Sequence, residues 1–425
     1  MTPKPPRSEL PPTPLHGTAV EERFAALSAF IAHHRHLWAP RPFVHRTLAW
    51  EEDFPQVAAW LRRQSTERIC AMEADPWSRL AEADDVPHML RRWARHRTTG
   101  VTLGVVATGS IAGLEHHRVR FRVPGRKWGQ VKAFIGAVAA AWPAQGGRVV
   151  EWCAGHGHLG RTLAHHAGVS AVLLEREINR AKQAQALIAR LGVEARFVPA
   201  DVLQPGSWSH LGPDVVAVGL HACGVLNATL LRQGCARQAP LMAVAPCCPH
   251  VGVPAGEDFV PLSAVGRATG IRLNPSALRL SIADEVVATP KQRARRSHEQ
   301  AWRLGLDLLV REATGDDRYR SLGVLPTGAL RVANFATFCR QQSHRLGLPL
   351  PPRWDPEHAE QAGWERARVA RGLGVVRSLF RRPLEVWLAL DRALMLHEAG
   401  RQVEVGLFCS AQQTPRNILI LSRSS

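Results

Sequence analysis

The sequence has few lysines and few acids. Of its 425 residues, 54 are Lys or Arg and 36 are Asp or Glu, which gives a net charge of +18. Only five of the 54 basic residues are Lys, so GC-rich coding explains part of the Arg excess, but it does not explain the shortage of acids. An excess of positive charge favours a polyanionic partner, of which RNA, as tRNA or rRNA, is the simplest.

The sequence also lacks a long apolar run and a regular cysteine framework. No apolar stretch reaches the ~18 residues of a membrane span, so we expect no membrane association. The eight cysteines do not have disulfide-framework spacing, and Cys247 and Cys248 are adjacent. Because the chain shows no secretory signal, we expect reduced thiols in a cytoplasmic protein.

The pattern along the chain predicts five regions. Six prolines in the first fifteen residues indicate a disordered tail, and later segments alternate between helical and strand-like periodicity. We expect a disordered tail over 1–15, a helical N-terminal region with one basic strand over 16–125, core strands one to five over 126–250, a mostly helical insertion over 251–382, and a closing helix and hairpin over 383–425.

Three basic clusters are candidates for contact with RNA phosphates. They lie at 91–97, 118–127 and 291–296. Within the second cluster, Val119, Phe121 and Val123 alternate with arginines, which predicts a half-buried strand with a basic outer face over 117–124. The third opens a predicted helix, where basic residues oppose the helix dipole, so a bound polyanion explains it better than helix stability.

The core begins with a strand, a tight glycine loop and a helix. Residues 148–152 form a short apolar run that contains Glu151, and the loop that follows contains Gly155 and Gly157. Strands are predicted over 171–175, 195–198, 215–219 and 241–245, with helices between them. Such alternation predicts a parallel, doubly wound α/β sheet.

Two cofactors compete for the glycine loop. Gly155, Gly157 and Gly160 satisfy G-x-G-x-x-G, which is also typical of dinucleotide-binding folds. A dinucleotide-binding strand normally carries an apolar residue where this chain has Glu151, whereas an acid suits the cationic methionine end of S-adenosylmethionine. The acids that end the next two strands then face the ribose hydroxyls and the adenine amine. We therefore predict S-adenosylmethionine, bound by Lys127 (at its carboxylate), Glu151, Ala154, Gly155, Gly157, Glu175 (at the ribose) and Asp201 (at the adenine).

Three runs of the core resemble a known family. The run Glu151-Trp-Cys-Ala-Gly-His-Gly-His-Leu-Gly, the element Leu220-His-Ala-Cys-Gly-Val and Pro246-Cys-Cys together resemble the methyltransferase-like domain family of the glutathione S-transferase C-terminal-domain-containing protein. More distantly, they resemble tRNA 2'-O-methyltransferases that modify the acceptor stem. This resemblance implies a class I (Rossmann-like) methyltransferase sheet. The chain departs from the family at Cys153, where the motif has its first glycine, and at Leu226-Asn-Ala, where the family has an acid.

Soft and imidazole side chains gather at the predicted ends of strands four and five, and we predict that they are catalytic: His221, Cys223, Cys247, Cys248 and His250. Three roles remain open. They are positioning of an acceptor with a His as base, covalent attack by a Cys thiolate, and zinc binding. The C-x-x-C spacing of a zinc site is absent, so we predict no metal.

The sequence favours an S-adenosylmethionine-dependent methyltransferase that acts on RNA. A non-catalytic RNA-binding protein that keeps the fold is one alternative, and a dinucleotide-dependent oxidoreductase is another. Both are disfavoured by the acids at the strand ends, because a platform without cofactor does not need them and a dinucleotide does not suit Glu151.

Overall fold

The computed structural model describes residues 13–81, 83–95, 101–115, 117–144, 147–283 and 289–424. The chain divides into two compact units. The sheet unit consists of Met1–Ala32, Thr99–Ile282 and Arg382–Ser425, and the helical unit consists of His33–Thr98 and Ala283–Arg381.

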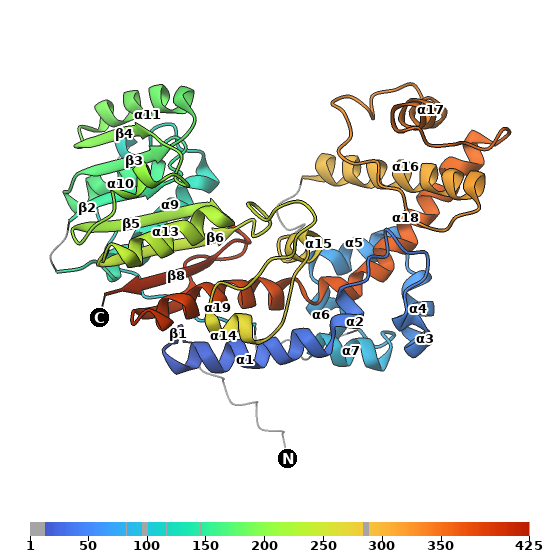
Figure 1. Ribbon diagram of the computed structural model, residues 1–425, viewed down its shortest axis with the longest axis horizontal. Coiled ribbons are helices and arrows are strands. Elements are labelled where there is room, and N and C mark those ends of the chain that lie inside the picture. The colour runs from blue at the N-terminus through green and yellow to red at the C-terminus, as the bar shows by residue number, and fades with distance from the viewer. Residues whose placement is uncertain are drawn as a thin grey trace, which may run out of the picture. The chain divides into compact units, whose positions relative to one another are not determined.

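The sheet unit is built on one eight-stranded sheet with the order β1-β7-β8-β6-β5-β2-β3-β4 (Figure 1). Its strands are β1 (Leu15–His16), β2 (Arg148–Trp152), β3 (Ala171–Glu175), β4 (Ala195–Pro199), β5 (Val215–Cys223), β6 (Leu241–Cys247), β7 (Gln402–Leu407) and β8 (Ile418–Arg423). Strands β2 to β6 pair in parallel, whereas β8 pairs antiparallel with both β6 and β7. The inner strands are almost continuous apolar runs, as expected of parallel strands that are covered on both faces.

Helices cover both faces of this sheet. The helices of the sheet unit are α1 (Thr18–His33), α8 (His117–Arg120), α9 (Gly125–Ala140), α10 (His158–Ala167), α11 (Ile178–Leu191), α12 (Pro205–Trp208), α13 (Val225–Ala236), α14 (Ala264–Ala268), α15 (Pro275–Leu280) and α19 (Arg381–Glu398). On one face, Phe134 of α9 and Leu163 of α10 share a buried core with Val149 and Val218. Helix α13 packs on the opposite face, where a Cβ at Gly234 would lie 2.4 Å from the sulfur of Met242.

The direction of winding reverses between β2 and β5. From β2 the chain winds outward through β3 to β4, and it then returns to β5 on the other side of β2 and continues to β6. In a doubly wound sheet, ligands bind in the crevice beyond the carboxyl ends of the strands at this switch point. The loops after β2 and β5 therefore border the expected site.

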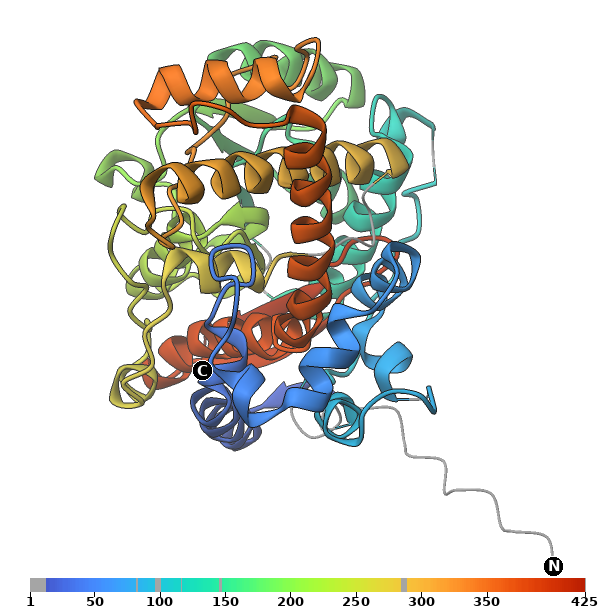
Figure 2. The ribbon, with the colours of Figure 1, turned by 90° about the vertical axis from the view of Figure 1, so that its right-hand side faces the viewer.

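The helical unit consists of α2 (Arg35–Trp38), α3 (Trp50–Asp53), α4 (Pro55–Arg62), α5 (Thr66–Ala74), α6 (Pro76–Ala81), α7 (His88–Arg95), α16 (Pro290–Thr314), α17 (Phe335–Leu346) and α18 (Pro356–Ser378). Helices α16 and α18 pack closely at glycines, since a Cβ at Gly363 would lie 2.6 Å from the carbonyl oxygen of Ala301 (Figure 2). Its tryptophans Trp50, Trp60 and Trp93 are buried, so they belong to the core.

The predicted fold class is confirmed, including the closing hairpin β7–β8 that completes the sheet. Several local predictions were wrong. Residues 117–120 form helix α8 followed by a turn, not a strand, because Val119 and Val123 are buried at a spacing of four, which a helical turn satisfies as well as alternation does. Most of the predicted tail lies outside the described residues, but Leu15 pairs with Val405 in the sheet.

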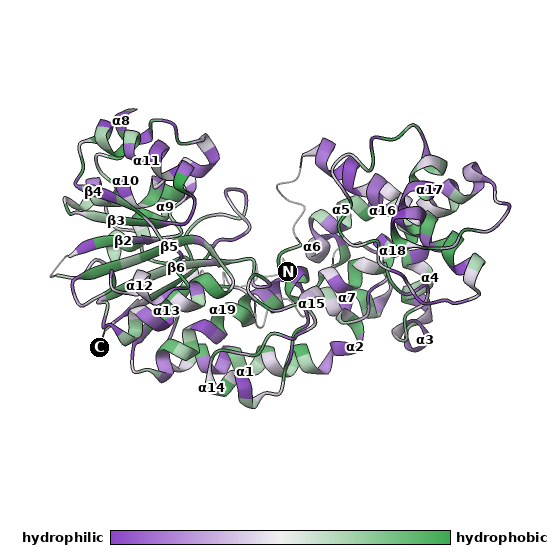
Figure 3. Cartoon of the chain, turned by 45° about the horizontal axis from the view of Figure 1, so that its top comes forward, coloured by the Kyte–Doolittle hydropathy of each residue, from purple (hydrophilic) through white to green (hydrophobic). Residues whose placement is uncertain are grey.

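The predicted regions also divide differently in space. Residues 33–98, which were predicted as one region with 16–32 and 99–125, form a unit with 283–381, and residues 251–282 belong with the sheet. Hydropathy varies along each surface helix, as expected of elements with one buried face (Figure 3). Among the described residues, no helix is both long and apolar enough to cross a membrane.

Candidate active site

The glycine loop after β2 is held close to the sheet. The amide of Ala154 donates to the carbonyl oxygen of Leu174 over 2.9 Å. Gly155 and Gly157 have φ angles of 57° and 63°, which side chains other than glycine rarely adopt. A Cβ at Gly157 would also lie 2.5 Å from Leu173 Cδ1. The loop thus presents backbone atoms without side chains at the carboxyl ends of the strands.

Glu151 is buried beneath this loop. Its side chain is 5% exposed, and its Oε2 accepts a hydrogen bond from the amide of Gly160 over 2.8 Å. Burial raises the pKa of Glu151 to about 7, although the Gly160 amide and the charges of Lys127 and Arg161 oppose the rise. An acid that is buried at a strand end and only partly neutralised suits a cationic ligand group.

Glu175 and Asp201 are the other two predicted acids. Glu175 ends β3, and its Oε2 accepts from the amide of Gly155 over 2.9 Å, which joins it directly to the glycine loop. Asp201 lies two residues beyond β4, is half-buried, and accepts from the amide of Leu203 over 3.0 Å. The structure therefore places all three acids at the ends of neighbouring strands, as the sequence predicted.

Lys127 lies in the first turn of α9 and is half-buried. Burial lowers its pKa, and the charges of Glu151 and Cys247 raise it, so the ammonium lies near both the acid and the thiols. Sequence reasoning missed its neighbour Arg161, which is 2% exposed and donates to the carbonyl oxygen of Phe121 over 3.2 Å. Nothing in the helical pattern of 158–167 distinguishes Arg161 from a solvated residue.

His221 is held in one orientation by Gln130, which sequence reasoning also missed. The amide nitrogen of Gln130 donates to the carbonyl oxygen of Gln413 over 2.9 Å, so its Oε1 is the acceptor that faces His221 Nε2 at 3.0 Å. Nε2 therefore carries the proton and Nδ1 presents a lone pair. Burial, reinforced by the charge of Lys127, lowers the pKa of His221 to about 4, so the ring is neutral at physiological pH.

Three residues with side chains adopt left-handed backbone conformations at this edge of the sheet. They are Cys153 after β2, His221 in β5 and Cys248 after β6, with φ angles of 59°, 68° and 42°. Cys153, where the chain departs from the resembled motif, adopts a conformation that glycine reaches without strain. Such strain is tolerated where the surrounding structure fixes the backbone, and it is concentrated at functional sites.

Cys223, Cys247 and Cys248 form a thiol cluster. Their three Sγ atoms all lie within 4.8 Å of one another, and those of Cys223 and Cys247 are 3.1 Å apart. Hydrogen bonds from the other two thiols lower the pKa of Cys248, with help from His250 and Arg416, whereas the same network raises the pKa of Cys247. One thiolate shared by the cluster is the charge state that this arrangement favours.

His250 completes the predicted set of catalytic residues. It follows the thiol cluster by two residues, and its Nδ1 is buried without a hydrogen-bond partner in the described part of the chain. The structure thus brings together the ends of β5 and β6 that carry His221, the thiol cluster and His250.

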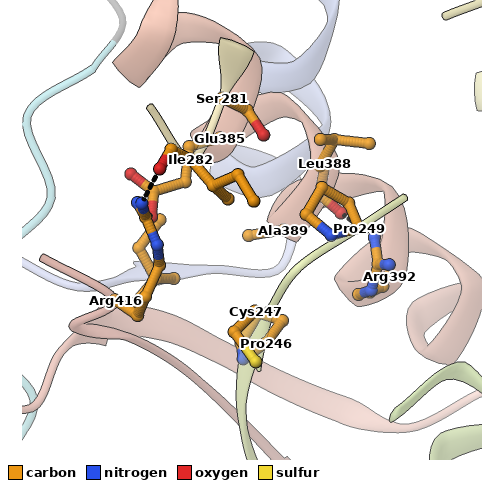
Figure 4. A pocket seen from close by; sticks show the side chains of 11 residues that line it. Pro246, Cys247, Pro249, Ser281, Ile282, Glu385, Leu388, Ala389, Arg392 and Arg416 are labelled. Atoms are coloured by element: carbon orange, nitrogen blue, oxygen red, sulfur yellow. Dashed lines mark hydrogen bonds and ion pairs between the residues drawn. The ribbon is translucent and has the colours of Figure 1, made fainter. Parts of the chain in front are cut away.

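A pocket lies beside Cys247, between the end of β6 and helix α19 (Figure 4). Arg392 and Arg416 border it, and Arg416 also pairs with Glu385 over 3.2 Å. Arg392 is 2% exposed and donates from Nε to Asn227 Oδ1 over 2.7 Å. Asn227, in the run Leu226-Asn-Ala that departs from the resembled motif, thus places its amide against a buried guanidinium.

Comparisons with known proteins identify a methyltransferase domain in part of the chain. Residues 126–251 match the model of a family described as a methyltransferase domain. The glutathione S-transferase C-terminal domain-containing protein of Xenopus laevis is 29% identical over 105 residues, which are 24% of this chain and 16% of that protein. The chain therefore matches about a sixth of the length of this curated relative.

Two solved structures align at low similarity. The cyclopropane synthase MmaA2 from Mycobacterium tuberculosis is 12% identical with a TM-score of 0.25, and the alignment covers 87% of this chain and 98% of the synthase. A coclaurine N-methyltransferase bound to N-methylheliamine and SAH is 11% identical with a TM-score of 0.24, over 85% of this chain and 89% of the enzyme. Together, the matched family and the sheet order show that residues 126–251 form a methyltransferase domain, whose sheet β7 and β8 complete.

Proposed function

We propose that this protein is an S-adenosylmethionine-dependent methyltransferase that acts on RNA. The main support for this cofactor is the set of three acids at neighbouring strand ends. They surround the glycine loop at the switch point of the sheet. Gly155 has open space where a Cβ would be, so a ligand can approach its backbone.

The residues present fit this cofactor. Glu151 would face the ammonium of the methionine end, and Lys127 would face its carboxylate. Glu175 accepts from the amides of Gly155 and Glu177, one at each oxygen, and it keeps acceptor capacity for ribose hydroxyls since each carboxylate oxygen has two lone pairs. Asp201 would face the adenine amine. When bound, S-adenosylmethionine supplies an electrophilic methyl group on a sulfonium.

The chain's own contribution to catalysis is mainly positioning. His221 is neutral, and its Nε2–H donates to Gln130. Its Nδ1 lone pair can therefore accept a hydrogen bond from the hydroxyl or amine of the methyl-accepting substrate. A pKa of about 4 makes His221 a weak base, which suits a substrate that loses its proton late in methyl transfer. Alignment of the acceptor with the methyl group supplies most of the rate.

Exposed arginines beside the site support an RNA acceptor. Three exposed arginines lie within the seven residues before Lys127: Arg120 in α8, Arg122 after it and Arg126 at the start of α9. Arg176 and Arg180, which follow Glu175, are exposed as well, and Arg180 also pairs with Glu175 over 3.7 Å. Positive charge next to a site for methyl transfer would hold a phosphate backbone while a base or ribose enters.

Calorimetry with the full chain tests the cofactor. We expect S-adenosylmethionine to bind and NAD not to bind. Glu175→Ala and Asp201→Ala should each weaken binding by about 1–3 kcal/mol, because a buried polar partner of the ligand is lost. Asp214→Ala is the matched control, since this exposed acid pairs with Arg148 at the start of β2, at the opposite edge of the sheet. Binding of NAD instead would contradict the proposal.

A further inference from the structure

The thiol cluster is assembled from two neighbouring strands. Cys223 and Cys247 are Cα partners at the ends of β5 and β6, and Cys248 is the next residue. The Sγ–Sγ separations run from 3.1 Å for Cys223 and Cys247 to no more than 4.8 Å for any pair. The sequence predicted this gathering, but it lacks the C-x-x-C spacing of a zinc site because the cysteines come from two different strands.

These distances bracket the separation in a tetrahedral zinc–thiolate site. With a Zn–S bond of about 2.3 Å, the sulfur atoms lie about 3.8 Å apart. Small rotations about the Cα–Cβ bonds reach that value from the observed range. Three thiolates are soft ligands, which favour zinc over magnesium or calcium.

His250 is the candidate for a fourth donor, although its ring nitrogens do not belong to the set of ligand atoms that lie within 4.8 Å of one another, so its side chain would have to move to reach the ion. His250 Nδ1 is buried and lacks a hydrogen-bond partner among the described residues, and a buried ring nitrogen without a partner is costly. His250 is two residues from Cys248 and close enough for its charge to stabilise the Cys248 thiolate. Cysteine and histidine are the usual ligands of zinc.

The surrounding charges suit a site with three thiolates. Zn²⁺ with three thiolates and a neutral imidazole has a net charge of −1. Lys127 and Arg392 lie near Cys247, and Arg416 lies near Cys248, so three cations compensate that charge. Nearby positive charge favours the ionised thiolates that a metal ion requires as ligands.

The backbone holds the ligand-bearing strand ends rigidly. The amide of Gly224 donates to the carbonyl oxygen of Cys247, and the amide of Val251 donates to that of Cys248, both over 3.0 Å. A Cβ at Gly224 would lie 2.0 Å from the carbonyl oxygen of Val251, so only glycine permits this approach. Metal sites need such preorganised supports.

We propose that Cys223, Cys247, Cys248 and His250 bind one Zn²⁺ ion at the ends of β5 and β6. Binding releases the protons that remain on the thiols to solvent and changes no oxidation state. The proposal concerns metal binding alone, so it does not depend on the methyltransferase function. The rival reading is a disulfide between Cys223 and Cys247, which would leave Cys248 and His250 without a shared role.

Metal analysis of the purified full-length chain, prepared without chelators, tests the proposal. We expect about one zinc ion per chain in the wild type. Cys223→Ser and Cys248→Ser should each reduce zinc about tenfold or more, and Cys235→Ser, which changes a thiol in α13, should retain it. A wild-type chain with iron, with no metal, or with a Cys223–Cys247 disulfide found by thiol counting and peptide mapping overturns the proposal.

Cobalt substitution of the wild type provides a test that does not depend on the folding of variants. A thiolate-to-cobalt charge-transfer band together with the visible bands of tetrahedral Co²⁺ supports the site, and octahedral Co²⁺ without charge transfer overturns it. His250→Asn tests the fourth ligand. It should weaken zinc binding at least about tenfold while the charge-transfer band persists, and unchanged affinity would remove His250 from the site.

Discussion

At the scale of single residues, Glu151 links cofactor binding to pH. Burial raises its pKa to about 7, and a bound ammonium favours the ionised carboxylate. Binding therefore releases a proton from Glu151 at low pH. We expect affinity for S-adenosylmethionine to rise by up to about tenfold per pH unit below pH 7 and to level off above it. Calorimetry across that range should show this rise in the wild type and its loss in Glu151→Gln. An unchanged profile in the variant would assign the pH dependence to another group.

Gly160 determines how closely α10 approaches the sheet. A Cβ there would lie 2.3 Å from Leu173 Cδ2 and 2.8 Å from Glu151 Oε2. We expect Gly160→Ala to lower the free energy of unfolding by about 1–3 kcal/mol in urea titrations, since the added methyl group must displace both neighbours. Gly206→Ala serves as the control, because nothing lies within 4 Å of its added Cβ. Equal stability of the two variants would contradict the close packing at Gly160.

Residue types at strand ends could be predicted, but the groups that orient them could not. Glu151, Glu175 and Asp201 follow apolar runs, so their positions at one edge of the sheet follow from strand order. Gln130 and Arg161 act through contacts with segments far away in sequence, and their own helical patterns give no sign of this. The thiol cluster was predicted as a gathering, but its distances depend on the register of β5 and β6.

At the scale of elements, helix α19 fixes the segment that follows the end of β6. The buried carboxylate of Asp391 accepts from the amides of Leu262 and Ser263, over 2.8 Å and 3.0 Å, and from the Ser263 hydroxyl. We expect Asp391→Ala to lower the free energy of unfolding by about 3 kcal/mol or more, because these donors lose their buried partner. Chemical denaturation measures the change.

Glu398 in the same helix offers a matched comparison. It accepts from the amides of Ala264 and Val265 in the same segment, but it is exposed. Water can replace its hydrogen bonds, so Glu398→Ala should cost about 1 kcal/mol or less. If both variants lost the same stability, burial would not be what makes the Asp391 contacts strong.

Long elements were predictable and short ones were not. The apolar runs of β2, β3, β5 and β6 and the capped start of α16 at Thr289 follow local rules. Helix α8 was mistaken for a strand because over seven residues the same burial pattern fits a strand and a helical turn. Strand β1 is only two residues long and forms because it pairs with β7, and no local sequence pattern predicts this pairing.

At the scale of the whole molecule, the division into two units could not be read from the sequence. The helical unit joins 33–98 to 283–381, and the sheet unit consists of three separate stretches. Local periodicity identifies helices but does not say which distant helices share a core. The closing hairpin was predicted because 402–409 and 417–421 are strand-like and because a methyltransferase sheet ends with an antiparallel strand, which is a constraint on the whole fold.

The net charge of +18 is also a property of the whole molecule, and it makes salt dependence the decisive measurement for an RNA partner. If RNA phosphates contact the exposed arginines beside the site, binding releases counterions, and the affinity falls steeply as salt rises. We expect the double variant Arg120→Gln, Arg126→Gln to reduce the slope of log affinity against log salt by about 2, one for each lost phosphate contact.

A second double variant controls for the change in net charge. Arg267→Gln with Arg272→Gln removes the same charge from and just after α14, and Figure 3 shows α8 and α14 at opposite ends of the sheet unit. Long-range attraction depends on net charge, so its loss would lower the affinity for tRNA and rRNA equally in both double variants. Direct phosphate contacts would change the slope of log affinity against log salt only in the variant that lacks Arg120 and Arg126. Equal slopes would show that the charge acts without a docked phosphate backbone. Absence of RNA binding even at low salt would move a protein or small-molecule acceptor ahead of RNA.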